Sequence, residues 1–293
     1  MRSFKVGKAS VGQRADVFVT GKFPGFARST LVKLFKSGKV LANKRTVKAG
    51  QKLHAGDQLK VDDSLLRTQP PAIDIPIIYE DADVVAMDKP AGVLTHSKGA
   101  FNDESTVASF LKAKITDDSL AGNRAGIVHR LDRATSGIII GAKNSKAASH
   151  LQKQFAQRRT KKIYLAIVEG QVDPVAAIID APIARNPKKP QTFYVNSPGK
   201  TAQTEYRAIK EFTKNSKTYS LLELKPTSGR THQLRVHLKY IGHPIVGDPV
   251  YGSGGANLLL HASSLELTLP SSERKIFEST MPKYFKDFYI DAK

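Results

Sequence analysis

Three clusters of polar residues contain the side chains of this chain that could do chemistry. The first places one carboxylate, Asp132, between two arginines in the run 129–137, His-Arg-Leu-Asp-Arg-Ala-Thr-Ser-Gly. The second is the run 229–235, Gly-Arg-Thr-His-Gln-Leu-Arg, and the third is Tyr164 within the run 162–166, Lys-Ile-Tyr-Leu-Ala. A carboxylate can act as a covalent nucleophile, and a neighbouring guanidinium favours its charged form. The clusters are therefore candidates for one site.

Each of these side chains also has an ordinary structural role open to it. Asp132 could cap a turn, and Arg235 could be a surface charge; for a lone Asp and a lone Arg, that is the better interpretation. Tyr164 lies on an otherwise apolar run, so it could be a core aromatic residue with a tethered hydroxyl. The choice between the structural and the catalytic interpretation depends on which other motifs accompany these residues in the chain.

The remaining polar motifs favour structural roles. No Cys or carboxylate stands at metal-ligand spacing from the histidines, so we expect structural imidazoles and no metal; these are His129, His232 and His237. The run 89–92, Lys-Pro-Ala-Gly, indicates a rigid turn at the end of a strand, lining the cleft. The run 247–249, Gly-Asp-Pro, indicates a structural turn.

The charge of the chain points to a polyanionic partner. It has 293 residues with 46 Lys and Arg against 26 Asp and Glu, a net charge of +20. Residues 1–60 hold 14 of these basic residues and only two acids, Asp16 and Asp57. Such an excess of positive charge indicates the kind of binding partner rather than the fold, and nucleic acid is the common partner of strongly basic proteins. A solvated lysine-rich surface is the plain alternative.

Composition also excludes several classes of protein. There is no Cys, which excludes disulfides, thiolate metal sites and thiol nucleophiles. No apolar run reaches the ~20 residues that a transmembrane helix needs, and no signal peptide is evident at the N-terminus. We therefore expect a cytoplasmic protein that does not contact a membrane.

The spacing of apolar residues divides the chain into two domains and a linker. A helix is predicted over 30–36, ended by Gly38, and short strands are predicted near 40–41 and 58–61. Residues 63–76 are polar, contain three prolines and lack a pattern, so they indicate a linker. The predicted organisation is thus an N-terminal domain at 1–62, the linker at 63–76 and a larger domain at 77–293.

The larger domain has the pattern of an α+β fold. A hairpin is predicted at 77–87, further strands at 163–169, 201–212 and 219–224, and helices at 144–155 and 231–241. Strands do not alternate regularly with helices, which favours a mainly antiparallel mixed sheet with flanking helices over a doubly wound fold.

The polar clusters, taken together, resemble a known family. The run 129–137, the Lys-x-Tyr-x-Ala strand, the run 229–235 and the later run 242–248, Gly-His-Pro-Ile-Val-Gly-Asp, are similar in sequence and order to the motifs of the RluA-type pseudouridine synthases. The resemblance covers roughly residues 75–285. Ser228 is a departure, since the family more often has Thr there, but the hydroxyl is kept.

The N-terminal domain resembles the α-L RNA-binding motif, named after a small-subunit ribosomal protein. Its matching elements are Arg14-Ala15-Asp16, Ala27-Arg28-Ser29, Gly38-Lys39-Val40, Asn43-Lys44 and Gly56-Asp57. The motif usually has Leu in place of Ala15 and Gly in place of Lys44. The resemblance implies a helix that presents Arg28, Lys33 and Lys36 to RNA phosphates.

The family resemblance implies isomerisation of uridine in RNA, with Asp132 as the catalytic carboxylate. Arg235 is implied as its partner in a buried ion pair. Tyr164 is implied as a ring stacked on the base, with its hydroxyl placed to take the proton from the carbon that gains the new bond. The departing uracil anion spreads its charge over nitrogen and two carbonyl oxygens, so one carboxylate suffices where glycoside hydrolysis needs two. No cofactor or metal is implied. Attack on the sugar, attack on the base and abstraction of a ribose proton all remain open for Asp132.

Other residues are expected to hold the RNA. Arg130 could fill the gap left by an extruded uridine or simply contact phosphate. Lys162 is expected to contact phosphate, and Arg230 to position the substrate. The expected partner is RNA, ribosomal by analogy, and the chain is expected to be a monomer. A non-catalytic RNA-binding or ribosome-assembly protein is the alternative function; a glycoside or nucleoside hydrolase lacks a second carboxylate beside Asp132.

Overall fold

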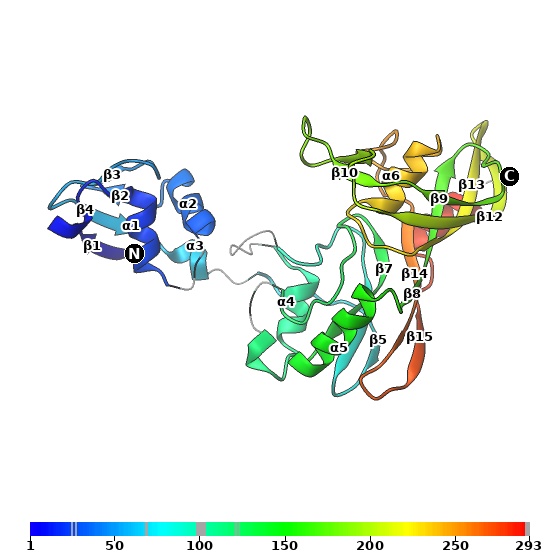
Figure 1. The fold of residues 1–293 in the computed structure, drawn as a ribbon, viewed down its shortest axis with the longest axis horizontal. Helices are drawn as coiled ribbons and strands as arrows, with labels where there is room; N and C mark the ends of the chain where they lie inside the picture. The colour runs from blue at the N-terminus through cyan, green and yellow to red at the C-terminus, as the bar shows by residue number, and fades with distance from the viewer. Residues whose placement is uncertain are drawn as a thin grey trace. The chain divides into compact units, whose positions relative to one another are not determined.

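The computed structural model of the chain describes residues 1–24, 26, 28–67, 70–97, 104–120, 122 and 124–290. They form two compact units (Figure 1). The first comprises Met1–Ala72 with His96–Ser105, and the second comprises Ile73–Thr95 with Thr106–Lys293. Among the described residues, no helix is both long and apolar enough to cross a membrane.

The first unit is a small antiparallel sheet packed against helices. Its strands lie in the order β1-β4-β2-β3. The strands are β1 (Arg2–Lys5), β2 (Val40–Ala42), β3 (Arg45–Thr46) and β4 (Gln58–Val61). The helices are α1 (Ala15–Lys22), α2 (Arg28–Lys36) and α3 (Ser64–Arg67), with a 3-10 turn at Lys8–Ser10.

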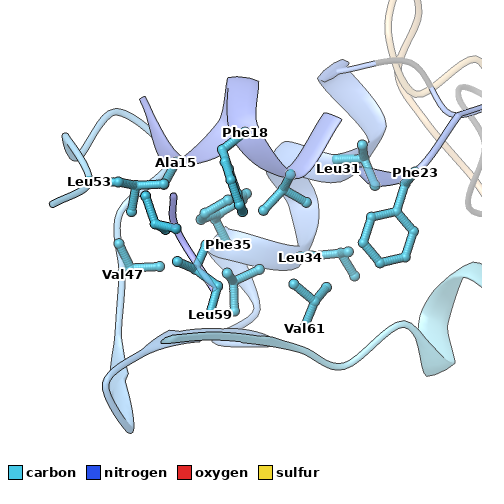
Figure 2. Close-up of a cluster of buried hydrophobic side chains, with 13 residues drawn as sticks. Ala15, Phe18, Phe23, Leu31, Leu34, Phe35, Val47, Leu53, Leu59 and Val61 are labelled. Carbon is cyan, nitrogen blue, oxygen red and sulfur yellow. The ribbon is translucent and has the colours of Figure 1, made fainter. Parts of the chain in front are cut away.

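The core of the first unit explains why its helices form (Figure 2). In α2, Leu31, Leu34 and Phe35 are buried, at the helical spacing that the sequence predicts. They pack with Phe18 from α1 and Leu59 from β4. The predicted helix and both strands are confirmed, whereas α1 was not predicted. Ala27, part of the α-L resemblance, lies outside the described residues.

The segment 63–76 is not uniformly irregular. A one-turn helix, α3, forms at Ser64–Arg67, and Leu66 packs against the core of the first unit. Residues 68 and 69 lie outside the described part of the chain. The interval predicted as a linker therefore contains a short element that its composition did not indicate.

The second unit is built on a nine-stranded mixed sheet. The order is β5-β6-β7-β14-β8-β13-β12-β9, with β15 paired to β14. Every pairing is antiparallel except that of β7 with β14, so the predicted α+β class is confirmed. The strands are β5 (Ile77–Glu80), β6 (Val84–Lys89), β7 (Ser136–Ala142), β8 (Lys161–Glu169), β9 (Ala176–Asp180), β12 (Gln203–Lys214), β13 (Lys217–Pro226), β14 (Leu260–Thr268) and β15 (Arg274–Glu278).

Helices and a hairpin flank this sheet. The α5 helix packs on β7 and β14, and α6 lies beside the two-stranded hairpin β10-β11 (Figure 1). The helices are α4 (Val107–Lys112), α5 (Ser145–Ala156), α6 (Gln233–Tyr240) and α7 (Lys283–Ile290), with a 3-10 turn at Asp118–Leu120; the hairpin strands are Ile183–Arg185 and Phe193–Val195. As predicted, the Asn144 side chain caps α5 by accepting a hydrogen bond from the backbone N–H of Ala147.

The junction of β7 with β14 holds the end of the run 129–137, which contains Asp132. Gly137, the last residue of that run, has φ +108°, and a Cβ there would lie 2.1 Å from the carbonyl oxygen of Ala262. Only glycine tolerates both this backbone conformation and so close an approach. The loop 129–135 is thereby held at the start of β7, where the parallel pair begins.

Candidate active site

The three predicted catalytic residues line one pocket of the second unit. Asp132 comes from the loop before β7, Tyr164 from β8 and Arg235 from α6. The loop 226–231 closes another part of the wall, and Arg130 and Arg230 also line the pocket. The fold therefore gathers residues from three separate elements into one site.

The loop that carries Asp132 is held in place by hydrogen bonds to its backbone. Thr95 Oγ1 donates to the carbonyl of Leu131 (2.8 Å) and accepts from the Leu131 N–H (3.2 Å). The N–H of Gly92 donates to the carbonyl of Arg133 (2.8 Å). Hydrogen bonds on both sides of Asp132 thus restrict the position of its carboxylate.

Lys89 completes this support. Its side chain is fully buried, and Nζ donates to the carbonyls of Pro90 (2.9 Å), Val93 (2.9 Å) and Arg133 (3.2 Å). Burial lowers the pKa of Lys89 to about 7, although the nearby charge of Asp132 opposes the shift. The run 89–92 was expected to line the cleft, but none of its residues is among those that line the pocket. Lys89 instead joins the backbone of residues 90–93 to that of Arg133, next to Asp132.

Arg235 serves two carboxylates. Its Nη1 lies 3.4 Å from Asp132 Oδ2, so the predicted pair is present. Its Nε and Nη2 each lie 2.7 Å from an oxygen of Asp248, a shorter and bidentate contact. Asp248 is fully buried and also accepts from the N–H groups of Val250 and Tyr251. The expectation that Asp248 belongs to a plain turn is incomplete, because its carboxylate orients the guanidinium.

Electrostatics within this group follow from burial and pairing. Burial acts on both Arg235 and Asp248, but their mutual hydrogen bonds prevail: the pKa of Arg235 is raised and that of Asp248 is lowered. Both side chains therefore stay charged. Two carboxylates share one guanidinium, and the partly exposed one, Asp132, faces the pocket.

His232 lies near the same oxygen of Asp132 that Arg235 contacts. Its Nε2 lies 3.9 Å from Asp132 Oδ2, and its Nδ1 lies 2.8 Å from Tyr251 Oη. Because Tyr251 Oη accepts from the N–H of Phe193 (2.9 Å), the hydroxyl proton is available to His232 Nδ1. Burial lowers the pKa of His232. A neutral ring bonded in this way carries its proton on Nε2 and directs it toward Asp132.

His232 was expected to be structural, and sequence reasoning missed its place in the pocket. Its backbone is left-handed, with φ +57°, at the start of α6. Such a conformation is uncommon outside glycine and concentrates at functional sites. Its position three residues before Arg235, almost one helical turn, was the available signal.

Tyr164 contributes a ring to the pocket wall. It packs against two hydrophobic clusters of the sheet and lines the pocket beside Asp132. Burial, and then the charge of Asp132, raise the pKa of Tyr164 well above its usual value. Tyr164 is therefore a neutral phenol on an inner strand of the sheet, between β14 and β13, and packing holds it in position.

The six residues predicted to bind RNA divide between the two units. Arg130, Lys162 and Arg230 all lie at or beside the pocket in the second unit. Arg28, Lys33 and Lys36 lie on α2 in the first unit, on the face away from its core.

Arg28 has a structural partner that the sequence did not predict. Its Nη2 lies 2.9 Å from Asp16 Oδ2, and Arg14 binds the same carboxylate at 3.1 Å. Asp16 is buried, and hydrogen bonds from Arg14 and Arg28 hold its pKa below the usual value against the effect of that burial. The positive charge of Arg28 is therefore partly neutralised by Asp16 within the first unit.

Two other histidines have the structural roles expected of them. His129 Nε2 accepts from the N–H of Ile140 (3.0 Å), and the ring stacks on Phe155. Burial lowers the pKa of His129 to about 3, so the ring is neutral. His237 is buried and lies within hydrogen-bond distance of Thr204 Oγ1 and the carbonyl of Ala181.

Ser228 uses the hydroxyl that the family resemblance leads one to expect. Its Oγ donates to Gln233 Oε1 (2.7 Å), which also accepts from the N–H of Arg230 (3.0 Å). The side chain of Gln233 therefore ties the loop before α6 to the first turn of that helix.

Comparison with known proteins gives a consistent result. The family profile described as RNA pseudouridylate synthase matches residues 83–240. An uncharacterized RNA pseudouridine synthase of Aquifex aeolicus is 38% identical over 297 residues, spanning 94% of this chain and 93% of that protein. Ribosomal large subunit pseudouridine synthase D of Borreliella burgdorferi is 39% identical over 294 residues, spanning 94% and 88%.

The fold has a counterpart among solved structures. The human RNA pseudouridylate synthase domain containing 1 is similar with a TM-score of 0.59 and 27% identity, over 73% of this chain and 86% of that chain. The match of more than half the chain to one family profile and the two relatives that span nearly all of it point to the same family.

Proposed function

This chain belongs to the RluA-type family of RNA pseudouridine synthases, and we propose that Asp132 is the catalytic carboxylate with which it isomerises uridines of ribosomal RNA. The observation that carries the assignment is the pocket in which Asp132, Tyr164 and Arg235 meet. The alternative function, a non-catalytic RNA-binding protein, does not explain why these three side chains meet in one pocket.

The reaction breaks the bond between N1 of uracil and C1′ of the ribose and forms a bond between C5 and C1′. Three first steps are open to Asp132: attack on C1′, attack on the ring, and abstraction of a ribose proton. All three require a charged carboxylate that faces the nucleoside. Arg235 at 3.4 Å favours that charge, and Asp248 orients Arg235 without occupying Nη1.

Tyr164 is assigned two tasks. Its ring supplies an apolar face against which the extruded base stacks. Because its pKa is raised, the phenol stays protonated in the resting enzyme. If its oxygen takes the proton that C5 loses, it must give up its own proton in the same step, and the carboxylate of Asp132 is the acceptor in this pocket.

His232 completes the support of the carboxylate. A neutral imidazole with its proton on Nε2 directs a hydrogen-bond donor toward Asp132 Oδ2, now 3.9 Å away. We assign it a positioning role, since it acts through Asp132 and through the hydroxyl of Tyr251.

The substrate assignment rests on relatives and on charge. Several similar proteins are named ribosomal large subunit pseudouridine synthases, and residues 1–60 carry 14 of the 46 basic residues. We propose that residues 1–62 are an RNA-binding domain of the α-L type that presents Lys33 and Lys36 to ribosomal RNA. The enzyme is proposed to work in the cytoplasm as a monomer.

The experiment that tests the function combines an assay with a variant pair. Purified protein is incubated with unmodified ribosomal RNA, and pseudouridine is mapped. We expect Asp132→Asn to abolish product while its affinity for the RNA stays within about twofold, since the missing group acts on the nucleoside that reacts rather than on phosphates. Asp287→Asn, an exposed carboxylate on α7, is the matched control with full activity.

Two outcomes would contradict the proposal. The absence of pseudouridine from every ribosomal RNA tested would refute the substrate, and its absence from transfer RNA as well would refute the activity. Product from Asp132→Asn at the rate of the unsubstituted protein would refute the catalytic assignment alone.

A further inference from the structure

We propose that a second hollow, beside the uridine pocket, binds one phosphate of the RNA backbone next to the uridine that is modified. The proposal rests on the proposed function, which it deepens by naming the chemical group that the substrate must supply. The hollow is lined by residues of β8, of the end of α5 and the segment after it, and of the loops 129–130 and 227–230. It is called the anion subsite below.

The anion subsite is lined by cations and by no acid. Four basic side chains take part: Arg130, Arg158, Lys162 and Arg230. None of the residues lining the subsite is Asp or Glu. In the part of the chain that the structure describes, none of the four forms an ion pair.

Lys162 is the cation of the subsite whose burial calls for an anionic partner. It is partly buried, and its Nζ donates to the carbonyl of Ser228 at 3.3 Å. Burial, reinforced by the positive charge of Arg158, lowers the pKa of Lys162 to about 8. Withdrawing an ammonium from water is costly unless a charged partner compensates. Neighbouring Lys161 on the same strand shows the contrast, since it is exposed and pairs with Glu266 at 3.2 Å.

Arg158 is placed at a backbone position that suits glycine better. It follows the end of α5 with φ +56°, and its N–H donates to the carbonyl of Phe155 while the N–H of Arg159 donates to that of Gln154. This left-handed helix ending usually has Gly or Asn. An arginine accepts the strain here and in return contributes a guanidinium to the wall of the subsite.

The subsite adjoins the uridine pocket closely enough for one strand to occupy both. Arg130, Tyr164, Ser228, Gly229 and Arg230 line both hollows. A uridine whose base meets Tyr164 therefore has its own or its neighbour's phosphate within reach of these cations. Guanidinium groups bind phosphate oxygens in bidentate fashion, and an ammonium adds a point charge. A backbone phosphodiester is the anion that the position of the subsite favours.

The test removes one phosphate charge at a time. An oligonucleotide that contains the modified uridine is prepared with a single neutral methylphosphonate at each linkage in turn around that uridine. Binding is measured to the Asp132→Asn protein, so that turnover does not interfere. We expect one linkage at which the substitution weakens binding about tenfold, the size of one charge-assisted contact. In a protein that also carries Lys162→Met, the same substitution should cost little.

Two further variants separate the charge from the fold. Arg158→Gly relieves the left-handed strain, so this variant should fold as well as the unsubstituted protein while losing the same linkage effect. Lys161→Met and Arg159→Gln, next to the two test positions but outside the lining of the subsite, are the matched controls and should keep the full linkage effect.

The outcomes are distinguishable. A linkage effect that is equal in the presence and absence of Lys162→Met, at every position, would overturn the proposal. So would a pKa of Lys162, followed by NMR, that rises with inorganic phosphate but not with the oligonucleotide, because the subsite would then take free phosphate. If no RNA yields pseudouridine, the proposed function fails, whereas a linkage effect that disappears in Lys162→Met still supports a phosphate subsite.

Discussion

Arg235 is shared between two carboxylates that differ in burial. Asp248 is fully buried and holds Nε and Nη2, whereas Asp132 is about one-fifth exposed and meets Nη1 at 3.4 Å. The buried pair costs desolvation, and it is offset only while both partners remain. We infer that Asp248 keeps the guanidinium rigid, so that Asp132 can vary its contacts as the reaction proceeds.

Asp248→Asn is predicted to damage both folding and turnover. It leaves a buried guanidinium without its main counter-charge, and such a change costs about 3–5 kcal/mol of unfolding free energy. Turnover should fall at least tenfold with little change in RNA affinity, because Arg235 loses its orientation. Urea denaturation and single-turnover assays measure the two effects.

Asp132→Asn is the comparison for that prediction. Its carboxylate is more exposed and its ion pair longer, so the free energy of unfolding should change by less than about 1 kcal/mol. An equal loss of stability in the two variants would show that Asp248 is not the principal structural partner of Arg235.

At the scale of elements, the site depends on one parallel strand pair in an otherwise antiparallel sheet. The pairing of β7 with β14 aligns Ser136 with His261 and Gly137 with Ala262. Ser136 Oγ lies 2.9 Å from His261 Nδ1, and Tyr284 on α7 donates to the same hydroxyl. The loop that bears Asp132 enters the sheet at this junction, so strand spacing there controls the position of the carboxylate.

Gly137→Ala is predicted to disrupt this junction. The added Cβ would lie 2.1 Å from the carbonyl of Ala262, and φ is +108°, so β7 must move away from β14. We expect a loss of more than about 2 kcal/mol in unfolding free energy and a severe loss of turnover.

Gly242→Ala is the matched control for the junction. Gly242 has φ +89° but no atom within 4 Å of an added Cβ, so only the backbone strain of about 1 kcal/mol should appear. Thermal unfolding of the two variants distinguishes them. Equal shifts in Tm would contradict the argument from close approach.

At the scale of the whole molecule, the catalytic pocket and the strongly basic N-terminal segment belong to different units. The described pocket is lined entirely by residues of the second unit. The first unit has its own hydrophobic core and contains the strongly basic residues 1–60. One of the two acids in that segment, Asp16, is paired with Arg14 and Arg28. Phosphate contacts give affinity that falls with salt, independently of the catalytic step. Affinity and turnover should therefore be separable.

Removal of residues 1–72 is predicted to weaken RNA binding without stopping the reaction. The slope of log affinity against log salt should fall by roughly 0.7–0.9 for each phosphate that the shortened protein no longer neutralises. KM should rise while kcat at saturating RNA stays within a few-fold. Circular dichroism first establishes that the shortened chain is folded.

The full-length chain with Lys33→Gln and Lys36→Gln provides the control for this truncation. It should show an intermediate slope, since it loses two charges of the first unit and keeps the fold. An unchanged salt slope in both proteins would contradict an RNA-binding role for that unit.

The sequence by itself determined the features that depend on near neighbours in the chain. Apolar spacing predicted α2, α5 and α6, and the cap at Asn144 was evident from residue type. Local patterns suffice there because helix faces and caps involve residues three or four positions apart. The catalytic set was implied by the family resemblance, and the motifs that carry that resemblance are contiguous runs.

Only the tertiary structure decided the pairings between distant residues. Asp248 as the main partner of Arg235, the burial of Lys89 under the loop 129–135 and the attachment of Arg28 to Asp16 had no local signal. The four cations of the anion subsite likewise come from separate segments. Charge partners and burial are set by how strands and helices pack, and that packing brings together side chains which the order of residues keeps apart.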